Sequence, residues 1–357
     1  TKWRQGGPKE PRADLDPITL ELINTGLSFI VRQMAHTMQR TAYSPVFAEA
    51  HDFTCALFDA GLELVAQFNG LPGHLGSLRF AVPWAVKAID TSTLQPGDVL
   101  IHNDPYRGAP HLPEVCVIRP IFAGGEIVLW AATTAHQIDT GGKEPGSMPG
   151  DATEIYQEGL IIPPIKLFER GKECEDVFRL ILANVRTPRS SYGDLLAMCG
   201  SLLTAERLFG ELVERWGLET VLAYLPEIKD HAERRMRIAM GVLPCGVYRG
   251  TSVIDDDGVT NDAYHIHAAV AILDDGSVIV DYRGSSPQAR GPVSAAYSVA
   301  HAAALNSLLQ VLAADLPVNQ GIHRPLHIIA PPGTVVNVNH PGPLNSGNTE
   351  SHNFLAE

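Results

Sequence analysis

The spacing of apolar residues predicts a long helix near the start of the chain. Asp16 and Pro17 supply a capping residue followed by proline at the first helical position, and we expect the helix to run to about Thr41. Apolar side chains recur at helical spacing at Leu20, Ile23, Leu27, Ile30, Val31, Met34 and Met38. Such a stripe is typical of a packing face, so this helix should lie against the core.

Runs of apolar residues predict strands between about residues 52 and 135. Segment 98–102 has the pattern of a short strand, and segment 126–135 has that of a longer one. A further strand is expected to start near Asp52, and its side chains should alternate between two faces. One face should carry Asp52, Thr54 and Ala56, and the other Phe53, Cys55 and Leu57.

A helix is expected over about 75–89, where apolar residues return to helical spacing. His74 stands just before it and either caps the helix or faces a site; capping is the favoured interpretation. Between about 174 and 240 the pattern is again helical.

After Pro244 the pattern predicts strands again, and Asp275-Gly276 indicates a hairpin turn. The expected strands cover 246–248, 253–258, 264–276 and 278–282, followed by a helix near 294–314 and a segment rich in Pro and Gly. The fold class is therefore α+β with several subdomains: a β-rich N-terminal metal-site region, a helical middle and a β-rich C-terminal part. We expect a mobile arm over 1–15 and domains over 16–170, 171–243 and 244–357.

Composition narrows the class of protein. The chain has 357 residues, of which 45% are hydrophobic and 19% charged, enough for a sizeable buried core. Forty acidic and 27 basic residues give a net charge of -13, which argues against binding nucleic acid or anionic membranes. No apolar stretch is long enough to span a bilayer, and residues 1–7 lack the apolar region of a secretory signal, so we expect a cytoplasmic protein. Five scattered cysteines without a C-x-x-C pair indicate neither a disulfide framework nor a zinc finger.

The segment from His102 to Glu114 concentrates imidazoles and carboxylates at a strand end and in a rigid loop. Its prolines and its glycine restrict the backbone, so His111 and Glu114 should lose little entropy when they bind a ligand. His136 follows at the end of the next expected strand. Neutral imidazole together with carboxylate suits Mn²⁺, Fe²⁺ or Zn²⁺ and leaves positions open for substrate. The set therefore predicts a divalent-metal site.

Each of these residues also has a structural explanation, because a single histidine more often satisfies a core or surface hydrogen bond. Asp52 is a further candidate ligand, or else an ordinary turn or cap residue. His102, Asp104 and Glu158 are the candidate acid/base groups, with bonding to a backbone amide as the alternative for Glu158.

The loop over 140–159 is rich in Gly and Pro and is a candidate lid beside this site. The chain contains neither of the two common glycine-rich phosphate-binding motifs, so ATP, if used, should bind elsewhere. His265 and His267 alternate on one strand face without a nearby carboxylate, and we expect them to be structural.

The combined motifs resemble the hydantoinase B/oxoprolinase family, which includes the metal-carrying subunits of acetone and acetophenone carboxylases. The resemblance spans nearly the whole chain. It is carried by the segments at 16–21, 52–59, 103–106, 111–115, 156–160, 184–188, 193–195, 256–258 and 319–321. One departure is Glu114, where the family usually has Asp; another is length, since family members generally continue beyond the point that matches Glu357, which suggests a fragment or a split subunit.

The resemblance implies a subunit that works with a larger ATP-binding, hydantoinase A-type partner in a hetero-oligomer. The partner binds ATP-Mg and phosphorylates a carbonyl or amide oxygen, and this chain's metal site completes the reaction. The resemblance places metal ligands at His111, Glu114 and His136, with Asp52 as a neighbour or fourth ligand.

The leading hypothesis is ATP-dependent hydrolysis of a small cyclic amide. The first alternative is ATP-dependent carboxylation of a ketone, in which the same ion stabilises an enolate. The second is a non-catalytic assembly subunit whose partner performs all the chemistry.

Overall fold

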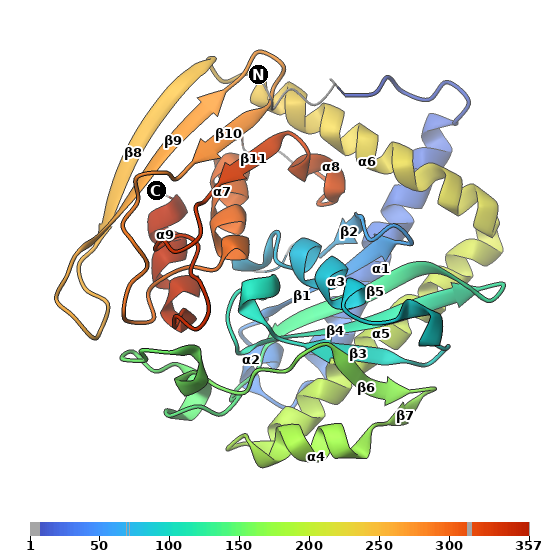
Figure 1. The fold of residues 1–357 in the computed structure, drawn as a ribbon. Helices are drawn as coiled ribbons and strands as arrows, with labels where there is room; N and C mark the ends of the chain where they lie inside the picture. Colours follow the sequence, from blue (N-terminus) through green and yellow to red (C-terminus); the bar gives the residue numbers. More distant parts are fainter. Residues whose placement is uncertain (1–7, 69, 71, 313–315, 357) are drawn as a thin grey trace.

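Two β-sheets lie side by side in the structure, which is a computed structural model describing residues 8–68, 70, 72–312 and 316–356 (Figure 1). The first sheet is antiparallel and has the strand order β2-β1-β5-β4-β3-β6-β7. Its strands are β1 (Phe53–Asp59), β2 (Leu64–Gln67), β3 (Val99–His102), β4 (Glu114–Ala123), β5 (Glu126–His136), β6 (Ile165–Glu169) and β7 (Lys172–Glu173). The second sheet has the order β11-β10-β9-β8, from β8 (Gly246–Ile254), β9 (Tyr264–Ile272), β10 (Val278–Asp281) and β11 (Leu326–Ile329).

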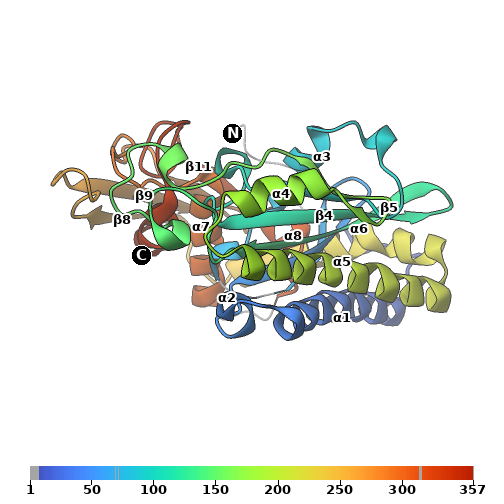
Figure 2. The ribbon, with the colours of Figure 1, turned by 90° about the horizontal axis from the view of Figure 1, so that it is seen from below.

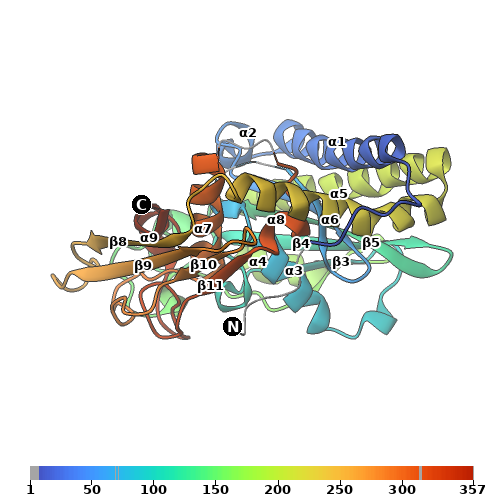
Figure 3. The same cartoon turned by 90° about the horizontal axis from the view of Figure 1, so that it is seen from above.

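Helices pack on both faces of the first sheet, and others lie where the first sheet meets the second sheet. They are α1 (Pro17–Thr41), α2 (Pro45–Ala48), α3 (Leu78–Lys87), α4 (Glu175–Ala183), α5 (Pro188–Trp216), α6 (Leu218–Met240), α7 (Tyr297–Leu312), α8 (Gln320–His323) and α9 (Glu350–Ala356). In edge-on views, α1 and α5 lie on one face of the first sheet and α3 lies on the other (Figures 2 and 3). This arrangement confirms the predicted α+β class.

Helix α1 has the predicted bounds and the predicted packing face. The Asp16 carboxylate accepts a hydrogen bond of 2.8 Å from the Thr19 amide and so caps the helix. The stripe is buried from Ile23 to Met38, while Leu20 is only partly buried. Of the predicted arm over 1–15, residues 1–7 lie outside the described residues.

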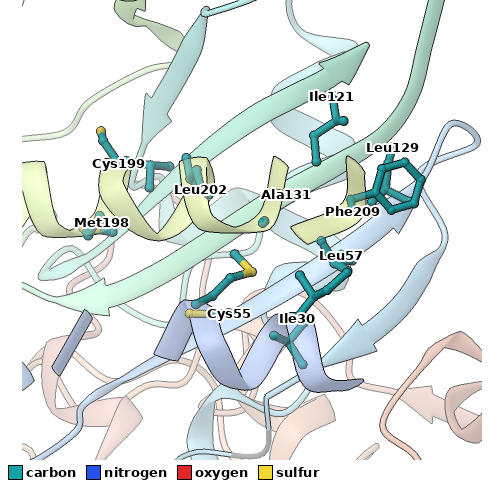
Figure 4. Close-up of a cluster of buried hydrophobic side chains, with 14 of the residues drawn as sticks. Ile30, Cys55, Leu57, Ile121, Leu129, Ala131, Met198, Cys199, Leu202 and Phe209 are labelled. Carbon is teal, nitrogen blue, oxygen red and sulfur yellow. The ribbon is translucent and has the colours of Figure 1, made fainter. Parts of the chain in front are cut away.

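Strand β1 alternates as the sequence predicts, and this alternation divides the core. Phe53, Cys55 and Leu57 join the cluster beneath α1 and α5, part of which is drawn in Figure 4. Ala56 lies on the opposite face, in the cluster covered by α3. The two faces of the first sheet are therefore buried separately, and the α3 face is the one that carries Asp52.

Helix α6 takes part in two cores. Apolar residues within 221–228 pack in the cluster that α1 and α5 cover on the first sheet. Ala232, Met236 and Met240 pack in the cluster of the second sheet. Between these stretches, Lys229 forms ion pairs with Asp59 and Glu63. The predicted helical segment 171–243 thus ties the two sheets together, and the predicted domain boundaries remain predictions.

Several expected elements differ in extent. Helix α3 starts at Leu78 rather than 75, because Gly76 has φ of 115° and cannot be helical. Strand β8 is continuous over 246–254, where two separate strands were expected, because its polar middle pairs with β9 while its side chains face solvent.

The predicted hairpin at Asp275-Gly276 is present between β9 and β10, with Gly276 at φ of 72°. Elements α8, β11 and α9 are additions to the predicted set. In the described part of the chain, no helix is both long and apolar enough to cross a membrane.

Candidate metal centre

Strand register brings three of the four predicted ligands to one edge of the first sheet. Glu114 opens β4 and is the direct cross-strand partner of His136, the last residue of β5. Asp52 precedes β1, whose first residue Phe53 pairs with Ala135, and the His136 amide donates to the Asp52 carbonyl over 3.0 Å. Because directly opposed residues of antiparallel strands point to the same face, all three side chains lie on the α3 face.

His111 is delivered by the loop before β4. The Glu114 amide donates to the His111 carbonyl over 3.1 Å, so a tight turn separates the two residues. The His111 Nε2 lies 3.1 Å from His136 Nδ1 and 3.6 Å from Glu114 Oε1. His136 Nδ1 is also 3.8 Å from Glu114 Oε1 and 4.0 Å from Asp52 Oδ2. The structure therefore brings all four predicted metal ligands together.

His74 is a fifth member of this cluster. It ends a short 3-10 helix (Pro72–His74), and its Nε2 lies 2.9 Å from Glu114 Oε1 and 3.4 Å from Asp52 Oδ1. The favoured capping role is wrong, because Ser77 holds the N-cap position of α3 while the His74 ring turns into the site. Its position before an apolar helix is the only sequence signal, and that signal does not say where the ring points.

Asn345 supports the cluster from the far end of the chain. Its side-chain oxygen accepts a hydrogen bond of 2.6 Å from His111 Nδ1, which leaves the His111 Nε2 lone pair facing Glu114 and His136. The Asn345 side-chain amide in turn donates to the Ser147 carbonyl, which fixes its orientation. Asn348 reaches the same imidazole, with its Nδ2 at 3.4 Å from His111 Nε2. No sequence pattern marks either asparagine.

Burial and mutual charge shape the electrostatics of the cluster. Burial and the Glu114 charge raise the pKa of Asp52 to about 6. Burial lowers the pKa of His74, but Glu114 and Asp52 outweigh it and bring that pKa to about 9. Burial, with the nearby His111, lowers the pKa of His136 to about 4. Burial raises the pKa of Glu114, yet the neighbouring histidines hold it well below its usual range.

The donor set fits a divalent cation. Two imidazole nitrogens aim at the same carboxylate oxygen, and Glu114 Oε2 is buried without a hydrogen-bond partner in the described residues. An unpaired buried carboxylate oxygen is costly, and a bound cation would compensate it. Asp52 and His136 form the solvent-accessible side of the cluster, because their side chains are 27% and 18% exposed. The side chains of His74, His111 and Glu114 are buried. A ligand would therefore approach from the side of Asp52 and His136.

Glu158 lies behind Asn345. Its Oε1 accepts hydrogen bonds from the amides of Leu344 (2.8 Å) and Asn345 (2.9 Å), so the backbone-amide alternative describes the observed contacts. Its Oε2 is buried without a partner in the described residues. Burial raises the pKa of Glu158 to about 7, from an ordinary value of 4.5.

We expect the substitution Glu158→Gln to change the pH dependence of stability in metal-free protein. A carboxyl whose pKa is raised on folding contributes most below its unfolded pKa, and this contribution is lost as pH rises through about 7. Between pH 4.5 and 8 the wild type should lose roughly 2–3 kcal/mol relative to the glutamine variant, which still accepts both amides. Urea unfolding across this range measures the difference. Glu154→Gln, at an exposed neighbour, should follow the wild type, and parallel curves for all three proteins would refute the expectation.

The contacts of His102 and Asp104 differ from those of the four candidate metal ligands. The His102 ring is buried against Trp84, with 5.6 Å between ring centroids, and burial lowers its pKa to about 4. Asp104 accepts a hydrogen bond of 2.9 Å from the Tyr106 amide at the start of a short 3-10 helix. Within the described residues, neither side chain forms a hydrogen bond or an ion pair with the metal cluster, so their acid/base roles stay predictions.

Asp139 and Arg186 form hydrogen bonds with the loop over 140–159. The Asp139 carboxylate accepts hydrogen bonds from the amides of Gly141, Gly146 and Arg186. The Arg186 guanidinium pairs with Asp139 and donates to the carbonyls of Gly141, Gly142 and Glu144. These bonds anchor residues 141–146 of the loop, and its role as a lid stays a prediction.

Comparison with known proteins places these residues in a family context. The Hydantoinase B/oxoprolinase family model matches residues 16–357. The chain is 35% identical to the beta subunit of the caprolactamase of Pseudomonas jessenii, over 96% of this chain and 59% of that protein. It is 33% identical to the B-type subunit of a putative D-/L-hydantoinase of Pseudomonas sp. strain NS671, over 96% and 61%. The chain thus spans about 60% of the length of these relatives.

Solved structures agree with this fold. The crystal structure of the ATP-dependent caprolactamase from Pseudomonas jessenii matches with a TM-score of 0.88 and 35% identity, over 96% of this chain and 59% of that one. A nucleotide-free acetone carboxylase matches with a TM-score of 0.86 over 93% and 46%, but at 21% identity it bears on the fold alone.

Proposed function

The chain belongs to the Hydantoinase B/oxoprolinase family, and on that premise we propose that it is the metal-dependent catalytic subunit of an ATP-dependent cyclic-amide hydrolase. It completes the reaction on a substrate that a larger, hydantoinase A-type partner has phosphorylated with ATP-Mg. The observation that carries this proposal is the convergence of Asp52, His111, Glu114 and His136 at one sheet edge. Their setting in a chain 35% identical to a caprolactamase subunit supports the reaction class.

These four residues would hold one divalent ion, with Mn²⁺, Zn²⁺ and Fe²⁺ as the candidates for mixed imidazole and carboxylate ligands. When bound, such an ion supplies Lewis-acid polarisation of a carbonyl and activates water near neutral pH. The chain contributes rigidity, because Asn345 fixes the His111 ring and the β4–β5 register fixes Glu114 against His136. Ligands that are already oriented lose little entropy on binding.

Substrate would enter from the side of Asp52 and His136, the two members of the set that solvent reaches. The deeper members, His111 and Glu114, lie in a protein interior where electrostatic interactions are stronger than in water. Glu158 holds the segment at 344–345 through two amides and so acts on the site through Asn345.

The proposal is tested by reconstitution with a hydantoinase A-type partner. The complex is supplied with ATP, Mg²⁺ and a panel of lactams, hydantoins and 5-oxoproline, and ring-opened product is measured beside phosphate release. We expect product formation that requires ATP, this chain and its metal. Bicarbonate-dependent carboxylation of a ketone, with no ring opening, would replace the proposal by the carboxylase alternative. Ring opening by the partner alone would make this chain an assembly subunit.

A further inference from the structure

The candidate ligand atoms fall into two groups that share Glu114. One group is His111, Glu114 and His136, and the other is Asp52, His74 and Glu114; within each group the atoms lie within 4.8 Å of one another. A single four-ligand ion uses the first group and Asp52, and His74 then contacts two of its ligands without being one itself. His74 is buried, and both of the groups nearest its Nε2 are carboxylates.

We propose that Asp52, His74 and Glu114 form a second divalent-cation position, so that the cluster is a dinuclear centre bridged by the two carboxylates. The geometry of Asp52 points to this role, because its Oδ1 lies 3.4 Å from His74 whereas its Oδ2 lies 4.0 Å from His136. One carboxylate thus presents one oxygen to each histidine side of the cluster. Two-metal sites hold their ions about 3.5–4 Å apart with carboxylates of this kind between them.

Glu114 supplies the second argument. Its Oε1 serves all three histidines, at 2.9 Å from His74, 3.6 Å from His111 and 3.8 Å from His136. Its Oε2 is fully buried and has no hydrogen-bond partner in the described residues. An ion pair between Glu114 and His74 would leave that oxygen unpaired at a cost. A cation at either position could compensate that oxygen, and two cations would leave one Glu114 oxygen for each.

The second position would take a small divalent ion that accepts mixed nitrogen and oxygen ligands, such as Mn²⁺ or Zn²⁺. Its only imidazole is His74, whereas the first position has two, so it should bind its ion more weakly. It also borders Asp52, the most exposed ligand, so the second ion would face the side from which substrate arrives. This inference rests on the proposed metal centre and adds a second ion to it.

The test is metal titration of the full chain with Mn²⁺ or Zn²⁺ by calorimetry and elemental analysis, together with electron paramagnetic resonance of the manganese form. We expect two equivalents and a spin-coupled spectrum in the wild type, and one equivalent with an uncoupled spectrum in His74→Ala. Asp52→Asn, at a partly exposed position, should also lose the coupling and serves if His74→Ala does not fold. His267→Ala, whose ring is exposed on the second sheet, should behave as the wild type.

One equivalent in both the wild type and His74→Ala, with loss of that ion in His136→Ala, would overturn the second position and leave the proposed function intact. Absence of metal from every protein would overturn both. These outcomes separate the failure of this inference from the failure of the first site.

Discussion

Replacement of His136 by alanine is expected to remove the metal from the first position and abolish product formation, while the chain stays folded and still assembles with its partner. His136 Nδ1 lies within 3.1–4.0 Å of His111, Glu114 and Asp52, so its loss removes one of two imidazoles from the site. Changes in groups that merely support a metal ligand typically cost about 10–100-fold in affinity, so a direct ligand should cost at least about 100-fold. His136 is the more exposed of the two imidazoles, at 18% against 1% for His111, so the fold should tolerate its loss better.

Four quantities are measured in His136→Ala and in the wild type: metal content, assembly with the partner, ATP turnover by the partner and product formation. His111→Ala should give the same loss of metal, with a larger effect on stability because its ring is buried and bonded to Asn345. His267→Ala is the matched control. If the variant no longer assembled while the partner continued to turn over substrate, the catalytic role proposed for this chain would be contradicted.

Asp257→Ala, in the loop between β8 and β9, should be among the most destabilising single substitutions in the part of the chain around the second sheet. The buried Asp257 carboxylate accepts hydrogen bonds from the amides of Val259, Thr260, Arg290 and Gly291. It also accepts one of 2.7 Å from the hydroxyl of Tyr264. Truncation leaves five donors without their acceptor, and each buried unpaired donor costs about 1–3 kcal/mol before relaxation and water recover part of it. We expect a loss of about 4 kcal/mol.

Asp256→Ala is a close control, because that neighbouring carboxylate is exposed and, among the described residues, accepts a hydrogen bond only from the Gly258 amide. It should change stability by less than about 1 kcal/mol. Urea midpoints and thermal unfolding of both variants measure the contrast. Equal losses in the two variants would mean that the Asp257 bonds do not stabilise the fold.

Local periodicity explains which parts of this fold are predictable. Helix α1 and the two faces of β1 follow from spacing alone, because burial on one side selects the residues on that side. The pattern divides strand β8 at its middle because its side chains there face solvent, and only its pairing with β9 maintains it. Elements held by partners distant in sequence leave a weaker local signal, as in β11, which pairs in parallel with β10.

The residues of the site also divide into those that a local sequence pattern marks and those that it does not. Asp52, His111, Glu114 and His136 lie at strand ends and in a rigid loop, so residue type and position both mark them. His74 and Asn345 enter the site through contacts 40 and 234 residues distant in sequence, and no local pattern encodes such contacts. His102 has the residue type and the strand-end position, yet its ring packs on Trp84. Residue chemistry alone therefore does not separate a ligand from a core histidine.

The bond from Asn345 to His111 also joins two residues that are far apart in the order of synthesis. His111 lies in the loop before β4 and His136 ends β5, so both are made early, whereas Asn345 is made more than two hundred residues later. Until that late segment docks, nothing fixes which His111 nitrogen carries its proton, and the first half of the chain presents an unfinished metal site. Tight metal binding should therefore follow the docking of the segment that carries Asn345.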